Sequence, residues 1–198
     1  MLKINAQLER LLEFTVEVEK LKNIQRKTKP VGLERYENSA EHSWHVCLMA
    51  LMFKEFAEDD INIDRVIKML LIHDLGEIDT GDIIIYQSES LENKQKEEQG
   101  VKRLLSFLSE EQAAEYLSLW QEFEAGESVD SKYARAIDRV PPLLHNLHGD
   151  LHSWREHKIK KEQVLQLNSR IAHGSEALWS ILKERLEMAF KSMEGDPL

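Results

Sequence analysis

Apolar residues recur every three or four positions through most of this chain, which is the spacing of one face of an α-helix. Leu8, Leu11, Leu12, Val16 and Leu21 mark such a face at the start of the chain. Only eight glycines and four prolines interrupt the pattern in 198 residues. The sequence therefore predicts an all-α fold, and this length favours a single domain spanning residues 1–198.

Capping residues and prolines predict where the helices begin and end. We expect Ser39 to cap the second helix, Asn62 or Asp64 the third, Ser109 with Gln112 a later one, and Asp130 the next. Gly76, Gly126 and Gly174 are expected terminators or separators. Pro141 and Pro142 predict a kink beside Asp138. The expected loops are 27–38 and 79–82, and the expected later helices are 92–108, 110–125, 162–172 and 175–193.

Composition narrows the class of protein. No apolar run approaches the ~20 residues that a membrane span needs, and residues 1–7 lack the pattern of a secretion signal. The single cysteine, Cys47, cannot form an internal disulfide and lies among apolar neighbours, so we expect a buried thiol. These features favour a cytoplasmic protein without a membrane partner.

The formal net charge of −10 disfavours binding to a polynucleotide, which requires many phosphate contacts. A small phosphate ester remains compatible with this charge. One metal ion and one or two arginines can reverse the local field.

Two imidazoles and two carboxylates occur in an order that can close around one divalent metal: His42, the doublet His73-Asp74, and Asp138. The doublet ends a markedly apolar helix, where an unpaired aspartate would cost several kcal/mol. Such a nitrogen and oxygen donor set suits Mn²⁺, Co²⁺, Fe²⁺, Zn²⁺ or Mg²⁺ and leaves positions for water and substrate. Any one of these residues alone is more often an ordinary core or surface side chain, so the inference depends on the set.

Several ordered motifs carry a resemblance to a known family. They are Glu-Asn-Ser-Ala-Glu-His-Ser-Trp at 37–44, His-Asp-Leu-Gly-Glu at 73–77, Thr-Gly-Asp at 80–82, Ala-Ile-Asp-Arg at 136–139 and Ser-Trp-Arg-Glu-His at 153–157. With these the chain resembles the HD-domain metal-dependent phosphohydrolases, and most closely the branch that contains bacterial 5′-deoxynucleotidases. The resemblance implies an HD-type helical bundle, with a metal-binding region at about 26–148 and C-terminal helices at about 160–193 packed on it.

The resemblance also implies roles for individual residues. His42, His73, Asp74 and Asp138 would bind the metal, with His45 a rival of His42. Glu77 and Asp82 would be the catalytic acids, although either could instead cap a helix or face solvent in a loop. Arg26 aligns with an arginine that contacts the substrate phosphate, and Arg35 is a second candidate for that contact. The relatives place a tryptophan shortly after this arginine, whereas this chain has Lys27-Thr28-Lys29-Pro30, which leaves the sugar and base contacts unassigned.

A further group, His145, His148, Asp150 and His152, follows the two prolines. It could build a second metal site, or it could be a histidine-rich helix end at the surface. Gly149 indicates that the helix stops before these histidines can share one face.

The expected activity is hydrolysis of a nucleoside or deoxynucleoside 5′-monophosphate to nucleoside and phosphate, with one divalent metal per chain. The resemblance also implies a homodimer. Two alternatives remain open. One is an HD phosphohydrolase acting on nucleoside triphosphates or on cyclic or alarmone nucleotides. The other is a non-catalytic scaffold or nucleotide sensor.

Overall fold

The computed structural model describes residues 2–83 and 91–194, and within these ranges the chain is helical with a single isolated β-bridge, Gln25 with Asn38. The all-α prediction is confirmed. The helices, with 3-10 turns marked η, are α1 (Leu2–Val18), η1 (Glu19–Asn23), α2 (Ser39–Met52), η2 (Lys54–Phe56), α3 (Ile63–Ile72), α4 (Glu77–Thr80), α5 (Leu91–Leu105), α6 (Glu110–Ala125), α7 (Val129–Asp138), α8 (Val140–His148), α9 (His152–Glu156), α10 (Lys161–Asn168), η3 (Ser169–His173) and α11 (Glu176–Glu194).

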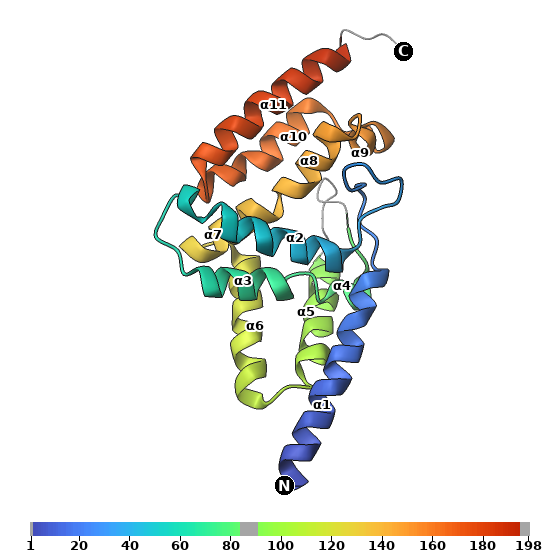
Figure 1. Cartoon of the computed structure of the whole chain (residues 1–198), viewed down its shortest axis with the longest axis vertical. Helices are drawn as coiled ribbons and strands as arrows, with labels where there is room; N and C mark the ends of the chain where they lie inside the picture. Colours follow the sequence, from blue (N-terminus) through green and yellow to red (C-terminus); the bar gives the residue numbers. More distant parts are fainter. Residues whose placement is uncertain (1, 84–90, 195–198) are drawn as a thin grey trace.

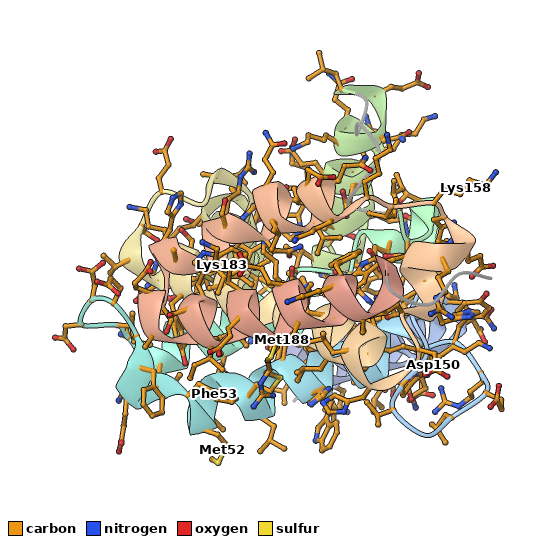
Figure 2. All side chains as sticks on the ribbon, turned by 90° about the horizontal axis from the view of Figure 1, so that it is seen from above. Met52, Phe53, Asp150, Lys158, Lys183 and Met188 are labelled. Atoms are coloured by element: carbon orange, nitrogen blue, oxygen red, sulfur yellow. The ribbon has the colours of Figure 1, made fainter. Side chains whose placement is uncertain are left out.

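Three helices form the centre of the bundle: α2 packs on α3, and α7, which comes much later in the chain, packs on both. Val46, Leu70 and Ile137, one from each, are fully buried in the core. Helices α5 and α6 extend this core at one end, while α1 projects away from the bundle at its N-terminus (Figure 1). Seen from above, α10 and α11 lie side by side over the other end (Figure 2).

Most of the expected helix ends are confirmed. The side chain of Asn62 accepts hydrogen bonds from the first turn of α3, and Ser109 with Gln112 forms a capping box on α6. Gly126 ends α6 in the left-handed conformation, with φ at 63°. The prolines fall in the first turn of α8, where a missing N–H is tolerated. The expected break beside Asp138 is therefore present, between α7 and α8.

Two N-cap predictions were wrong. Asn38 caps α2 in place of Ser39, because only Asn38 can exchange hydrogen bonds with Glu41 at the third helical position. Ser128 caps α7 in place of Asp130, whose carboxylate instead accepts hydrogen bonds from the Asn62 backbone and the Arg65 side chain.

Gly76 does not terminate α3, which ends at Ile72, and its φ is an ordinary helical −62°. A Cβ there would lie 2.4 Å from Glu97 Cγ and 2.7 Å from the Glu97 carbonyl oxygen. The glycine is required by the close approach of this turn to α5. The expected loop at 79–82 is also partly helical, because α4 forms one turn through Thr80.

The later boundaries differ in smaller ways. The expected helix 92–108 ends at Leu105, the expected helix 162–172 divides into α10 and η3, and the short helix α9 was not expected. Among the helices that the structure describes, none combines the length and apolar character needed to cross a membrane.

Candidate metal centre

Helix α2 brings His42 to the centre of the bundle. The capping box of Asn38 and Glu41 fixes the start of this helix, so His42 lies in its first turn. The ring is fully buried. Its Nε2 lies 2.9 Å from Asp138 Oδ1, and its Nδ1 lies 3.3 Å from Glu37 Oε2 without the alignment of a hydrogen bond. His42 therefore presents Nε2 toward the end of α7.

The end of α3 supplies His73 and Asp74. His73 follows the last residue of the helix, and its Nδ1 lies 2.8 Å from the Leu70 carbonyl oxygen. A carbonyl only accepts, so Nδ1 carries a proton in this contact, and Nε2 is the nitrogen that can offer a lone pair to a metal once its own proton is displaced. This Nε2 is buried and makes no hydrogen bond. A metal-binding histidine in proteins usually makes this backbone contact with its other nitrogen.

Three donor atoms, one each from His42, His73 and Asp138, lie within 4.8 Å of one another where α2, α3 and α7 converge, and Asp74 lies beside His73. His73 Nε2 lies 3.0 Å from Asp74 Oδ1 and 3.3 Å from Asp138 Oδ1, in addition to the contact between His42 and Asp138. Two ligands of one ion at bond lengths of ~2.1 Å stand about 3.0 to 3.4 Å apart in octahedral or tetrahedral geometry. The spacing, the donor types and the unpaired Nε2 all fit a divalent metal ion.

The electrostatics of this cluster favour added positive charge. Burial by itself would lower the pKa of His73, but Asp74 and Asp138 outweigh burial and raise it to about 9. Burial would raise the pKa of Asp138, yet contacts with His42 and His73 hold it well below its ordinary value. A divalent cation would satisfy the same carboxylates.

Arg26 joins the cluster from the segment after η1. Its Nη1 donates to Asp74 Oδ2 at 2.9 Å, and its guanidinium also lies 3.8 Å from Asp82 and 3.4 Å from Glu37. Although burial opposes its charge, these carboxylates raise the pKa of Arg26 further above its ordinary value. The arginine therefore stays charged and orients Asp74.

Glu77 and Asp82 lie beside the cluster with their ionisation disfavoured. Burial and the neighbouring charge of Asp74 raise the pKa of Glu77 well above its ordinary value, and Glu77 Oε2 accepts a hydrogen bond from Ser39 at 2.6 Å. Burial also raises the pKa of Asp82, although Arg26 opposes that effect. Carboxyl groups with raised pKa values near a metal cluster are candidates for proton transfer.

Both acids line a pocket beside the four donor atoms. The pocket adds residues to which the sequence gave no role, among them the basic or aromatic side chains of Lys94, Phe123, Arg135, Arg139 and Trp154 and the acids Glu97 and Glu124. Two of these residues, Arg139 and Trp154, belong to motifs that carried the resemblance. Those motifs were the signal from which their place in the pocket could have been predicted.

Two candidates lie away from this pocket. Arg35 is exposed, and its guanidinium makes two contacts with Glu41, at 2.5 and 2.8 Å. His45 is one turn beyond His42 and groups with Glu37 and His145 rather than with the four donors. The structure thus brings His42, His73, Asp74, Asp138, Glu77, Asp82 and Arg26 together, and leaves Arg35 and His45 outside.

Comparison with protein families gives a match to the model of the HD domain, over residues 18–179. The curated relatives include human 5′-deoxynucleotidase HDDC2, 29% identical over 136 residues, and the Xenopus laevis protein of the same name, 26% identical over 178 residues. The human match covers 68% of this chain and 65% of the human protein, and the Xenopus match covers 81% and 85%. The chain thus spans slightly less than two thirds of the human relative.

A crystal structure of a predicted metal-dependent phosphohydrolase from Magnetospirillum magnetotacticum is also similar. It is 40% identical, with a TM-score of 0.88 over 94% of this chain and 96% of that one. A conserved hypothetical protein from Pyrococcus furiosus, 22% identical with a TM-score of 0.54 over 77% of this chain and 98% of that one, shares the fold.

Proposed function

Because the chain belongs to the HD domain family, we propose that it is a metal-dependent phosphohydrolase that releases phosphate from a nucleoside or deoxynucleoside 5′-monophosphate. The observation that carries the proposal is the convergence of His42, His73, Asp74 and Asp138 beside a pocket lined by Arg26, Glu77 and Asp82. The relatives named 5′-deoxynucleotidase support the choice of substrate.

The proposed division of labour follows from the surroundings of each side chain. When bound, a divalent ion supplies Lewis acidity toward the phosphoryl group and lowers the pKa of a water molecule. Arg26 orients Asp74 and faces the charge that shifts during phosphoryl transfer. We assign to Glu77, which accepts a hydrogen bond from Ser39, the role of accepting the proton of the attacking water, and the charge of a bound divalent ion would favour the ionised carboxylate that this role requires. We assign to Asp82 the role of orienting the sugar or assisting the leaving oxygen.

The test is phosphate release from matched ribo- and deoxynucleoside 5′-monophosphates, with Mn²⁺, Co²⁺, Mg²⁺ or a chelator, for the wild type and His73→Ala. We expect metal-dependent release that the substitution abolishes. His157→Ala, which changes a histidine outside the cluster and the pocket, is the matched control and should retain the activity. Absence of release from every monophosphate with every metal would refute the proposal.

The basic side chains of the pocket favour one second candidate, hydrolysis of nucleoside triphosphates. Lys94, Arg135 and Arg139 line the pocket in addition to Arg26 and Lys27, against two further acids, Glu97 and Glu124. Longer phosphate chains require such additional positive charge. Including triphosphates and a cyclic dinucleotide in the same assay discriminates the two activities. A chain that hydrolyses none of these, yet binds nucleotide, would be a sensor.

We further propose that the protein acts as a homodimer in the cytoplasm. The support is the outer face of α1, where Ile4, Leu8, Leu12 and Val16 recur every four residues and are each more than half exposed. Burying such a stripe against a second copy would remove apolar surface from water. Size-exclusion chromatography with light scattering tests the dimer, and a particle of 23.1 kDa would contradict it.

A further inference from the structure

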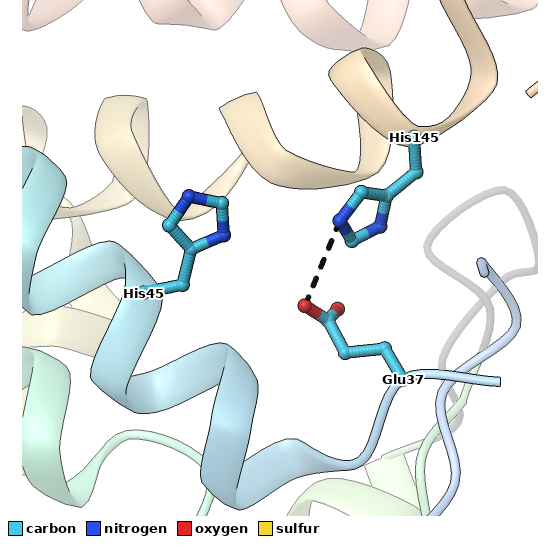
Figure 3. A group of neighbouring side chains, drawn as sticks. All are labelled: Glu37, His45 and His145. Carbon is cyan, nitrogen blue, oxygen red and sulfur yellow. Dashed lines mark ion pairs between the residues drawn. The ribbon is translucent and has the colours of Figure 1, made fainter. Parts of the chain in front are cut away.

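A second group of donor side chains lies on the opposite side of His42 from the metal centre. It consists of Glu37, just before α2, His45 on α2, and His145 on α8. Their ligand atoms all lie within 4.8 Å of one another. Figure 3 shows the two imidazole rings approaching the carboxylate from two different helices. We propose that Glu37, His45 and His145 form a second metal site that binds one divalent ion of the Zn²⁺ type.

The distances among the donor atoms of Glu37, His45 and His145 fit three ligands of one ion better than three side chains joined by hydrogen bonds. His145 Nε2 lies 3.8 Å from Glu37 Oε1, which is too long for a hydrogen bond. Two ligands of a tetrahedral zinc ion stand ~3.3 Å apart, so movements of about 1 Å or less per side chain would close the site. His45 is only partly buried, so its side chain has room to make that movement.

The surroundings prepare His145 to act as a ligand. The ring is only 5% exposed, and burial lowers its pKa, so it is neutral at pH 7. Its Nδ1 lies 3.0 Å from the hydroxyl of Thr28. Because a hydroxyl can accept as well as donate, Thr28 can hold the Nδ1 proton and leave the lone pair of Nε2 facing Glu37.

Glu37 carries the charge that the site needs. It is only 2% exposed. A buried carboxylate requires cations or hydrogen bonds around it, and the Arg26 guanidinium lies 3.4 Å from Oε2. Oε2 faces His42 and Arg26, which leaves Oε1 for the second ion.

One carboxylate and two imidazoles leave a fourth coordination position open, as in zinc sites that bind water or a substrate group. A surface pocket lined by these three residues together with Val31, Trp44 and Leu144 gives an ion a route from solvent. Glu37 therefore lies between two sites, with one oxygen toward each. Within the described part of the chain, His45 and His145 form no hydrogen bond or ion pair with the four candidate ligands of the first site, and none of the three residues lines the pocket beside it. A change at His45 therefore tests the second site separately from the proposed hydrolysis.

The test is a metal count on the untagged, full-length chain, without substrate. The protein is stripped with a chelator, equilibrated with buffered Zn²⁺ and assayed by mass spectrometry of the metal. We expect two ions per chain in the wild type and one in His45→Gln, where a partly exposed side chain is replaced with little risk to folding. His148→Gln, which lines the same pocket but is not a ligand, should keep two.

The variant His73→Ala, loaded with Co²⁺, isolates the second site. We expect a visible absorption band typical of imidazole-bound Co²⁺, which disappears when His45→Gln is added. One ion in the wild type, two ions in His45→Gln, or no dependence of the Co²⁺ band on His45 would each overturn the second site. Because these measurements count ions and do not follow hydrolysis, they leave the proposed function to be judged separately.

Discussion

A buried hydrogen bond away from the metal centre connects the two helices that carry His42 and Asp138. The hydroxyl of Tyr133, on α7, donates to the backbone carbonyl of Ala50 in the last turn of α2, at 2.9 Å. Carbonyls in the last turn of a helix lack a partner within the helix. Tyr133 is 1% exposed, so Tyr133→Phe removes this donor without changing the packing of the ring.

The expected cost follows from leaving that carbonyl buried and unsatisfied. Such a group destabilises the folded state by ~1–3 kcal/mol. For a chain of this size, each kcal/mol corresponds to about 2–4 °C in Tm, so we expect Tm to fall by roughly 4–8 °C for ~2 kcal/mol. Burial raises the pKa of Tyr133 above its ordinary value, so the hydroxyl remains a donor below the unfolded pKa of about 10. The difference in the free energy of unfolding between the wild type and Tyr133→Phe should therefore be constant from about pH 6 to 9.

The assay is equilibrium unfolding in urea, followed by circular dichroism at 222 nm in the presence of a chelator, so that metal binding does not contribute. Tyr116→Phe, at a partly buried position on α6, is the control and should change the free energy of unfolding by less than ~0.5 kcal/mol. An equally small change for Tyr133→Phe would refute the assignment of this bond as a link between α2 and α7.

Three further predictions concern the site and the thiol. Glu77→Gln should keep its metal and lower kcat by about 10²–10⁴-fold in the phosphate-release assay, because the proton acceptor is lost; unchanged kcat would remove Glu77 from the mechanism. Arg26→Lys should weaken Mn²⁺ binding by about 10–100-fold in calorimetric titration, because Asp74 loses the contact that orients it; unaltered affinity would contradict that role. Burial raises the pKa of the Cys47 thiol to about 11, so at pH 8 roughly one thiol in a thousand is ionised. An aromatic disulfide reagent should react slowly with the native chain and at once in urea, and rapid native reaction would show the thiol to be accessible.

The sequence was most informative where chemistry is local. The doublet His73-Asp74 at the end of an apolar helix indicated two candidate ligands, and the prolines after Asp138 indicated the break between α7 and α8. Ser109 with Gln112 could be recognised as a capping box because both partners lie within one turn.

It was least informative where the partner of a side chain is distant in the chain. Asp130 resembles a helix cap, but its carboxylate is engaged by Asn62 and Arg65 on another helix. Gly76 resembles a terminator, but its small size serves the close approach of α5. Glu37 belongs to the motif at 37–44, but no function could be assigned to it from the sequence. Its position between His42 and His145 depends on how α8 packs on α2, which periodicity does not reveal.

The residues that line the pocket also come from distant parts of the chain, so the sequence did not predict several of them. Arg135, Arg139 and Trp154 reach it because α7, α8 and α9 turn back toward the metal centre. No spacing rule connects these positions with Arg26, more than a hundred residues earlier.

The most direct test of the metal centre is a crystal structure of the chain with Mn²⁺, with anomalous diffraction recorded at the manganese absorption edge. We predict a peak about 2.0–2.3 Å from His42 Nε2, His73 Nε2 and a carboxylate oxygen of both Asp74 and Asp138. A peak that lacks any of these four contacts, or no peak between α2, α3 and α7, would contradict the assignment of the centre.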